Sequence, residues 1–484
     1  MTNASPALAR AAALQALPEA ALAMAAALLT LACAQPFAPG PGSAVLAVVL
    51  SLSLARSRLD RDRRGRMEAA VALPLVGLAA TGVGLLLRDA PWLGAAAFTV
   101  GVASSVWLRQ FGEPARRASR LIALPFVTVL TVPHLSGVQH GPLPAVLVPV
   151  VVALLALAWV SLLDVLGRRL RLLPDVATPA HRPPAAARGR ATPNRMRPAA
   201  TTRMALQMAA ALAAAFAVGH AGFGQHWPWV VLTAFIVHSG NRGRLEVAYK
   251  SLLRLGGALG GTLAAAGLSV LSLPAGMHGG STAALILLAV FLGTWLRPLN
   301  YAWWALFVTV ALALLQNYAG LPATSEMTLR LAAIATGAAI GVATGWLLLP
   351  VRSTDVLRRR LADALAALGE ALDPATAQRS PVRFIHELDA VEALAPAFRA
   401  ARGLGLRPHW RQPADWIDAL AGCRASAVAL IETGTTPGNV RRAVGTARQA
   451  LRQPECLLDA LTALRDSLPL PPGHAESGHG WPQP

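Results

Sequence analysis

The chain contains about twelve apolar segments, several of them long enough to cross a lipid bilayer. A membrane-spanning helix needs roughly 20 apolar residues, and soluble proteins carry about 25% charged residues. Here 14% of the residues are charged and 55% are hydrophobic. These features predict an all-α integral membrane protein, with helices at 19–35, 43–56, 69–87, 92–108, 121–135 and 144–166, and at 204–220, 228–239, 254–273, 281–297, 301–317 and 330–350. The runs from Ser43 and Pro228 are short, so these helices either continue into adjacent basic turns or cross half of the bilayer.

The apolar segments fall into two blocks with similar landmarks. Met24-Ala25-Ala26 opens one block and Met208-Ala209-Ala210 opens the other. Trp107-Leu108-Arg109 and Trp295-Leu296-Arg297 then occur at nearly the same depth in each. Many transporters are built from internal repeats of this kind, so the pattern predicts two parallel six-helix repeats. The alternative is that the halves share only a membrane composition.

Arginine is concentrated in every second loop. Basic residues crowd the loops at 56–66, 109–120, 168–203 and 242–254, whereas 36–42, 136–144 and 274–281 contain no Lys or Arg. Because basic loops stay in the cytoplasm, both termini are expected there. These loops also explain the net charge of +19 without a nucleic-acid partner. A signal peptide ending at Ala32-Cys33-Ala34 is an alternative, but its removal would break the alternation of basic loops.

The composition along the chain predicts five parts. The Pro-, Ala- and Arg-rich stretch between the halves cannot bury a core, and apolar residues recur at helical spacing after Pro350. We expect a first transmembrane half at 1–166, a basic cytoplasmic linker at 167–203, a second transmembrane half at 204–350, a cytoplasmic helical domain at 351–468 and a disordered tail at 469–484.

Two apolar segments carry glycines one helical turn apart. Small residues at this spacing let helices approach closely in a membrane, so we interpret both stripes as packing faces. The alternative is that the missing side chains open a permeation path. The residues are Gly256, Gly257, Gly260 and Gly261 in one segment and Gly337, Gly341 and Gly345 in the other.

The region from Gln225 to Gly261 resembles a known family. It contains a Trp-x-x-Leu-Thr helix (Trp229 to Thr233), the basic loop Asn241-Arg242-Gly243-Arg244, and an arginine that enters a glycine-rich helix (Arg254 to Gly261). This pattern resembles the fusaric acid resistance (FUSC) family of bacterial inner-membrane proteins. Tyr301, and Arg330 ahead of Gly337, are similar to later helices of that family. The resemblance covers roughly 204–370.

The resemblance implies a multi-pass protein of the bacterial inner membrane with an anion pathway, similar to exporters of aromatic carboxylic acids. The chain departs from the larger exporters in two ways. The cytoplasmic domain expected after the first set of helices is reduced to the linker 167–203. The first half has Ser43–Leu50 where the second has its Trp-x-x-Leu-Thr sequence.

Cationic and aromatic residues at helix ends are the candidate substrate-binding residues. Arg109, Arg254 and Arg297 stand at the predicted cytoplasmic ends of helices, where each serves either as a topology anchor or as a substrate contact. An aromatic acid would need a flat apolar slot beside such a cation. The further candidates are Trp227, Trp229, His226, Tyr301 and Thr233.

These features favour an efflux transporter for organic acid anions, foremost aromatic carboxylates. A cytoplasm that is negative by 100 mV favours outward movement of a monovalent anion by about 2.3 kcal/mol, so export needs no carboxylate proton relay. Two alternatives are a passive anion channel and a non-transporting scaffold that acts through the C-terminal helical domain.

The sequence predicts no enzyme, cofactor or metal site. It contains no Gly-x-x-x-x-Gly-Lys-Ser/Thr motif for nucleotide phosphates. Cys33, Cys423 and Cys456 show neither metal-ligand spacing nor an even disulfide set. The expected partners are the lipid bilayer and a small organic anion. A homo-oligomer and a periplasmic adaptor protein are further options that the sequence leaves open.

Overall fold

The computed structural model describes residues 6–57, 63–111, 146–173, 200–240, 243–270, 279–318, 323–376, 379–405, 412–435 and 437–469, together with six single residues between 112 and 145. The contacts divide the chain into two compact units. Residues 4–176 and 190–350 form one unit, and the second contains the chain from Val351 onward. Most of the expected helix at 121–135, most of the linker 167–203 and nearly all of the tail 469–484 lie outside the described residues.

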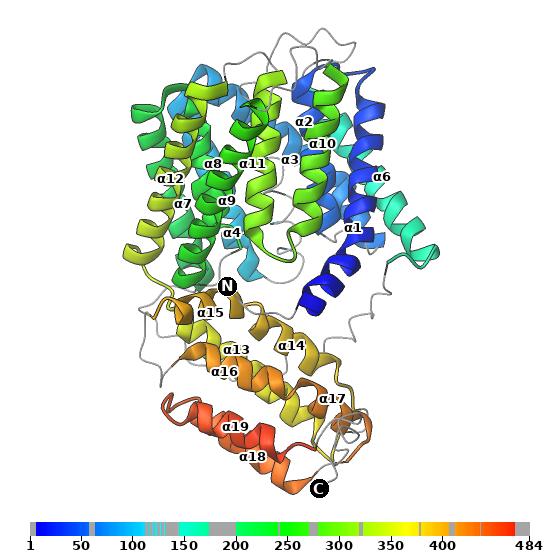
Figure 1. The fold of residues 1–484 in the computed structure, drawn as a ribbon, viewed down its shortest axis with the longest axis vertical. Coiled ribbons are helices and arrows are strands. Elements are labelled where there is room, and N and C mark those ends of the chain that lie inside the picture. The colour runs from blue at the N-terminus through cyan, green and yellow to red at the C-terminus, as the bar shows by residue number, and fades with distance from the viewer. Residues whose placement is uncertain are drawn as a thin grey trace, which may run out of the picture. The chain divides into compact units, whose positions relative to one another are not determined.

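The described residues of the first unit form α-helices and short 3-10 turns, with no strand. Its helices are α1 (Pro6–Ala34), α2 (Pro41–Ser57), α3 (Arg63–Asp89), α4 (Pro91–Leu108), α6 (Val148–Arg169), α7 (Ala200–Gly222), α8 (Trp227–His238), α9 (Arg244–Val270), α10 (Gly279–Leu296), α11 (Tyr301–Tyr318) and α12 (Ala323–Leu347) (Figure 1). Turn η2 (Arg109–Phe111) follows α4, and turn η3 (Gly224–His226) precedes α8. The protein is therefore an all-α membrane protein.

Seven of these helices are long and apolar enough to cross a membrane, namely α1, α3, α4, α6, α7, α9 and α12. Helices α2, α10 and α11 contain shorter apolar stretches. Helix α8 has 12 residues, a length of about 18 Å, which is well short of the roughly 30 Å of hydrocarbon in a bilayer.

Local sequence accounts for several helix starts. Pro91 and Pro228 lie in the first turns of α4 and α8, where proline costs no helical hydrogen bond and presets the backbone. Several helices begin earlier than expected. Helix α1 starts at Pro6 instead of residue 19, and α3 starts at Arg63 instead of residue 69. Helix α9 starts at Arg244 instead of residue 254, and α12 starts at Ala323 instead of residue 330. Both arginines at the expected starts, Arg254 and Arg330, thus lie inside helices.

The two halves of the first unit pack against each other through paired contacts. Helix α4 packs against α7, and α10 packs against α1, which lies beside it in Figure 1. Thr201 at the start of α7 donates a 3.4 Å hydrogen bond to Gln110 after α4. Trp295 at the end of α10 donates a 2.9 Å hydrogen bond to the carbonyl of Ala13 in α1. The end of the fourth helix in each half therefore bonds to the start of the other half.

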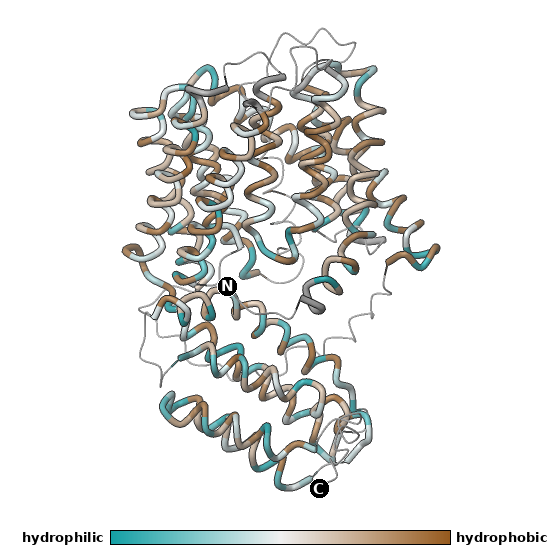
Figure 2. Tube along the Cα trace, in the orientation of Figure 1, coloured by the Kyte–Doolittle hydropathy of each residue, from teal (hydrophilic) through white to brown (hydrophobic). Residues whose placement is uncertain are grey.

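The second unit consists of amphipathic helices, in contrast to the apolar helices of the first (Figure 2). Its apolar side chains, such as Leu357, Leu361 and Phe384, are fully buried. Arg402 pairs with Asp415 and Asp418 across two of the helices, and its hydrogen bond with Asp415 raises the pKa of Arg402 above its usual value. The helices are α13 (Ser353–Ala371), α14 (Val382–Glu392), α15 (Ala395–Gly403), α16 (Pro413–Gly422), α17 (Arg424–Glu432), α18 (Gly438–Ala450) and α19 (Leu457–Ser467).

Candidate functional site

The short helix α8 is enclosed by its neighbours. Nine of its 12 residues are buried, and it packs against α7, α9 and α12. The contact with α12 depends on glycine. A Cβ atom at Gly337 would collide with the carbonyl oxygen of Val230, and one at Gly341 would lie 2.9 Å from Val237. Gly345 lies in ordinary contact with Val247 of α9. The stripe on α12 therefore lies where α8 and α9 pack against it.

The glycines of α9 bring that helix against α11. A Cβ atom at Gly257 would lie 2.6 Å from the carbonyl oxygen of Ala302, and one at Gly261 would lie 2.5 Å from that of Leu306. Gly260 is next to the Leu306 side chain at 3.3 Å. Gly256 takes no part in this contact, because no described atom lies within 4 Å of a Cβ built on it.

This close approach places Arg254 inside the protein. Its side chain is 1% exposed, and its Nε has no hydrogen-bond partner among the described residues. Tyr301 begins α11, its hydroxyl is buried, and Arg254 and Arg297 both act on it electrostatically. The sequence-based expectation put Arg254 at the start of its helix. That position is wrong because α9 begins ten residues earlier, at Arg244.

Arg297 and Arg56 share one aromatic ring. The guanidinium carbon of Arg297, just after α10, lies 5.4 Å from the ring centre of Trp304. That of Arg56, at the end of α2, lies 4.5 Å from the same ring. Such cation–π contacts hold a cation over an indole face without neutralising its charge. Sequence reasoning did not select Arg56, because nothing in the loop 56–66 separates one arginine from the others.

Arg330 is a further buried cation. It is 3% exposed, its guanidinium carbon lies 4.1 Å from the ring centre of Trp229, and the charge of Arg254 acts on it. Glu326 precedes it by one helical turn in the sequence. The sequence identifies Arg330 only through the family resemblance and not as a site residue. Its position ahead of the glycine stripe that begins at Gly337 is the sequence feature that could have indicated its burial.

Four arginines thus form a row through the first unit, which we call the arginine row: Arg56, Arg297, Arg254 and Arg330. Arg56 and Arg297 both lie over the ring of Trp304. Arg297 and Arg254 both act electrostatically on Tyr301. The charges of Arg254 and Arg330 repel each other. An anion bound among like charges is stabilised because it relieves their mutual repulsion. The row combines cations with three aromatic rings, those of Trp229, Tyr301 and Trp304.

The remaining sequence candidates are not placed in this row. Trp227 packs in an aromatic cluster with Phe216 and His220, at ring-centre distances of 5.4 and 4.8 Å. His226 lies in the turn η3 before α8. Thr233 is buried against Gly337. Arg109 begins the turn η2 after α4, a helix that packs mainly against α3 and α7.

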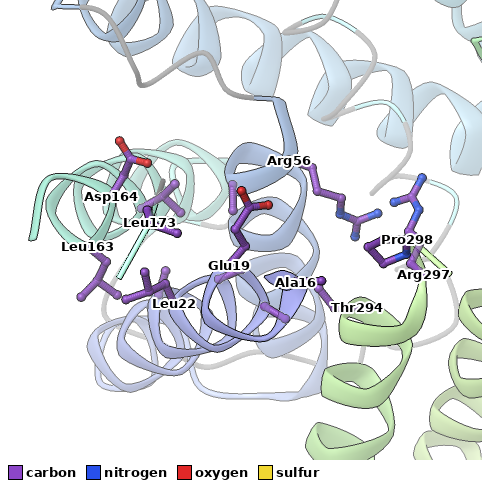
Figure 3. A pocket seen from close by; sticks show the side chains of 15 residues that line it. Ala16, Glu19, Leu22, Arg56, Leu163, Asp164, Leu173, Thr294, Arg297 and Pro298 are labelled. Carbon is purple, nitrogen blue, oxygen red and sulfur yellow. The ribbon is translucent and has the colours of Figure 1, made fainter. Parts of the chain in front are cut away.

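A cavity of about 190 Å³ opens beside the exposed end of the arginine row. It lies among α1, α2, α6 and the end of α10, and Arg56 and Arg297 line one side of it (Figure 3). Glu19 of α1 and Asp164 of α6 also line it. Within the described ranges, no cluster of His, Cys, Asp and Glu is suited to hold a metal ion.

Part of the chain is similar to a known family. Residues 209–344 match the family described as fusaric acid resistance protein-like. The matched segment contains Arg254, Arg297 and Arg330 of the arginine row, whereas Arg56 lies outside it. No curated protein and no solved structure matches the chain. Together with the seven apolar helices, the match indicates a membrane protein related to transport.

Proposed function

We propose that this protein exports small organic anions, foremost aromatic carboxylates, across a bacterial inner membrane by way of the arginine row. The observation that carries the proposal is the burial of Arg254. A buried charge without a full set of partners costs several kcal/mol, and ionisable groups inside membrane proteins mark substrate or ion pathways. A carboxylate would supply the partner that the Arg254 Nε lacks.

We also propose that the two halves are parallel repeats with both termini in the cytoplasm. The helix contacts support the repeat, because the α1–α2, α2–α6 and α3–α6 pairs recur in order as α7–α8, α8–α12 and α9–α12. The contacts between halves are paired in the same way, as α4–α7 and α10–α1. The basic ends of α2 and α9 then face the same side of the membrane.

The membrane potential can drive this export. Outward movement of a monovalent anion from a cytoplasm negative by 100 mV gains about 2.3 kcal/mol. We therefore expect flux to follow an imposed potential. Aromatic acid flux that ignores the potential and follows pH would contradict this part of the proposal.

The test of the site uses purified protein in liposomes loaded with benzoate. We expect Arg254→Gln to lower the efflux rate at least about tenfold, since a hydrogen bond to a charged group contributes about 1.5–3 kcal/mol. Arg88→Gln is the matched control, because Arg88 is exposed at the end of α3. Equal flux in both variants, with both correctly folded, would contradict the proposed path.

Two further measurements separate the alternatives. Single-channel currents in a planar bilayer would show a passive channel instead of an exporter, because a channel passes many ions in each opening. A deletion strain is complemented with variant genes and challenged with a panel of weak acids. Intracellular acid should accumulate when the complementing gene carries Arg254→Ala or Arg297→Ala. Unchanged acid tolerance in both variants would favour a scaffold that does not transport.

A further inference from the structure

The cavity at the exposed end of the arginine row carries both signs of charge. Arg56 and Arg297 lie together on one side, and Glu19 lies between them and Asp164 (Figure 3). Asp164 is already bound, because Arg168 donates to its two oxygens at 2.8 and 2.9 Å. Glu19 makes no hydrogen bond or ion pair with the part of the chain that the structure describes. Glu19 is therefore the carboxylate that remains to bind a ligand.

The wall between the charged groups is lined by small and apolar side chains. Ala16, Ala20 and Ala23 line the cavity from one face of α1, because residues three and four apart share a face of a helix. Their small side chains leave the space open, and Leu22 and Leu163 border it. A cavity of about 150 Å³ holds benzene in a protein interior, so this cavity of about 190 Å³ has room for one ring with short substituents.

We propose that this cavity binds a small zwitterion with an apolar body, with its carboxylate toward Arg56 and Arg297 and its protonated amine toward Glu19. The inference rests on the proposed function and narrows its substrate class to organic acids that also carry a cationic nitrogen. An acid without the amine is attracted by Arg56 and Arg297, but its carboxylate is repelled by that of Glu19, which stays unpaired. A protonated amine on the ligand forms an ion pair with Glu19 instead.

The experiment compares two ligands of the same shape on the full-length protein in lipid nanodiscs. The ligand 4-(aminomethyl)benzoate carries an ammonium group where 4-ethylbenzoate carries a methyl group. By isothermal titration calorimetry we expect the amine ligand to bind about threefold to fivefold more tightly, because exposed ion pairs contribute up to about 1 kcal/mol. Empty nanodiscs measure the partitioning of each ligand into lipid.

Two variants locate the bound ligand. Glu19→Gln should remove the preference for the amine ligand and leave 4-ethylbenzoate binding unchanged or tighter. Asp89→Asn is the matched control, because this carboxylate is exposed at the end of α3, and it should preserve the preference. Ala23→Leu should weaken both ligands, since the added atoms occupy the cavity. Equal binding of the two ligands, binding of neither, or an equal effect of Glu19→Gln on both would overturn the inference.

The outcome is separable from that of the proposed function. Glu19-dependent binding without any flux in liposomes would leave the cavity as a binding site and defeat the transport proposal. Arg254-dependent flux without Glu19-dependent binding would do the reverse.

Discussion

At the scale of single residues, the four members of the arginine row differ from one another in their exposure to water. Arg56 is exposed, Arg297 is half-buried, and Arg254 and Arg330 are almost completely buried. Arg254 is also the largest fully buried side chain in the described part of the chain. On the proposed path, an anion would lose its hydration in steps, and each arginine would replace part of it. The exposed Arg56 would attract the anion, whereas the buried Arg254 and Arg330 would compensate for its desolvation.

The cysteines of the second unit allow a prediction at the same scale. Cys423 is buried, and this burial raises the pKa of its thiol to about 11, while Cys456 is exposed. The thiolate is the reactive form, so at pH 8 only about one Cys423 thiol in a thousand is reactive. In a Cys33→Ala variant we expect iodoacetamide to modify Cys456 and to spare Cys423 until the protein is unfolded.

Mass spectrometry of the two cysteine-containing peptides measures this difference. Equal modification of both cysteines in the folded protein would show that helices α16 and α17 do not enclose Cys423 as the structure describes.

Among the helices, the contact between α9 and α11 leaves no room for an added methyl group at Gly257. Gly257→Ala would place a Cβ atom 2.6 Å from both the Ala302 carbonyl oxygen and the Ala305 Cβ, and forcing extra volume into a packed contact costs about 1–3 kcal/mol. Gly256→Ala is the matched control, because that position is open. We expect it to be neutral or stabilising by up to about 1 kcal/mol, since alanine favours the helix.

Thermal unfolding of the two purified variants in detergent measures the difference in their stability. If Gly257→Ala unfolds at the same temperature as Gly256→Ala, α9 and α11 do not pack as closely as described.

The sequence located the helices well where an apolar run is bounded by turn residues. Helix α4 was expected at 92–108 and spans Pro91–Leu108, and α11 was expected at 301–317 and spans Tyr301–Tyr318. Two of the errors at helix starts arose at arginines. Hydropathy treats an arginine as the end of an apolar segment, so α9 and α12 were started at Arg254 and Arg330. Only the packing of neighbouring helices reveals that these two charges are inside.

The same reason limited the prediction of the site. Arg254, Arg297, Trp229 and Tyr301 were chosen for residue type and place near a helix end, and the structure brings them together. Arg56 could not be found in this way, because it comes from the first half of the chain and meets Trp304 of the second half only through the fold.

For the whole molecule, the proposed parallel repeat makes a prediction about which side of the membrane each loop faces. We place single cysteines in a cysteine-free background as Arg66→Cys, Arg244→Cys and Gly280→Cys. The first two positions border basic loops, which stay in the cytoplasm, and the third borders a loop without Lys or Arg. A membrane-impermeant maleimide should label Gly280→Cys in intact cells, and the other two only after lysis. Labelling of Arg66→Cys and Arg244→Cys from opposite sides would contradict the parallel repeat.

The length of α8 has an electrical consequence for the whole molecule. With about 18 Å of helix against about 30 Å of hydrocarbon, at least one end of α8 lies below the membrane surface. Non-helical backbone at that depth, such as the turn η3 beside it, requires water or protein partners. If water supplies those partners, the transmembrane voltage falls across the shorter dry segment that remains. On the proposed path, an anion that passes Arg254 would then cross most of the voltage in one short step.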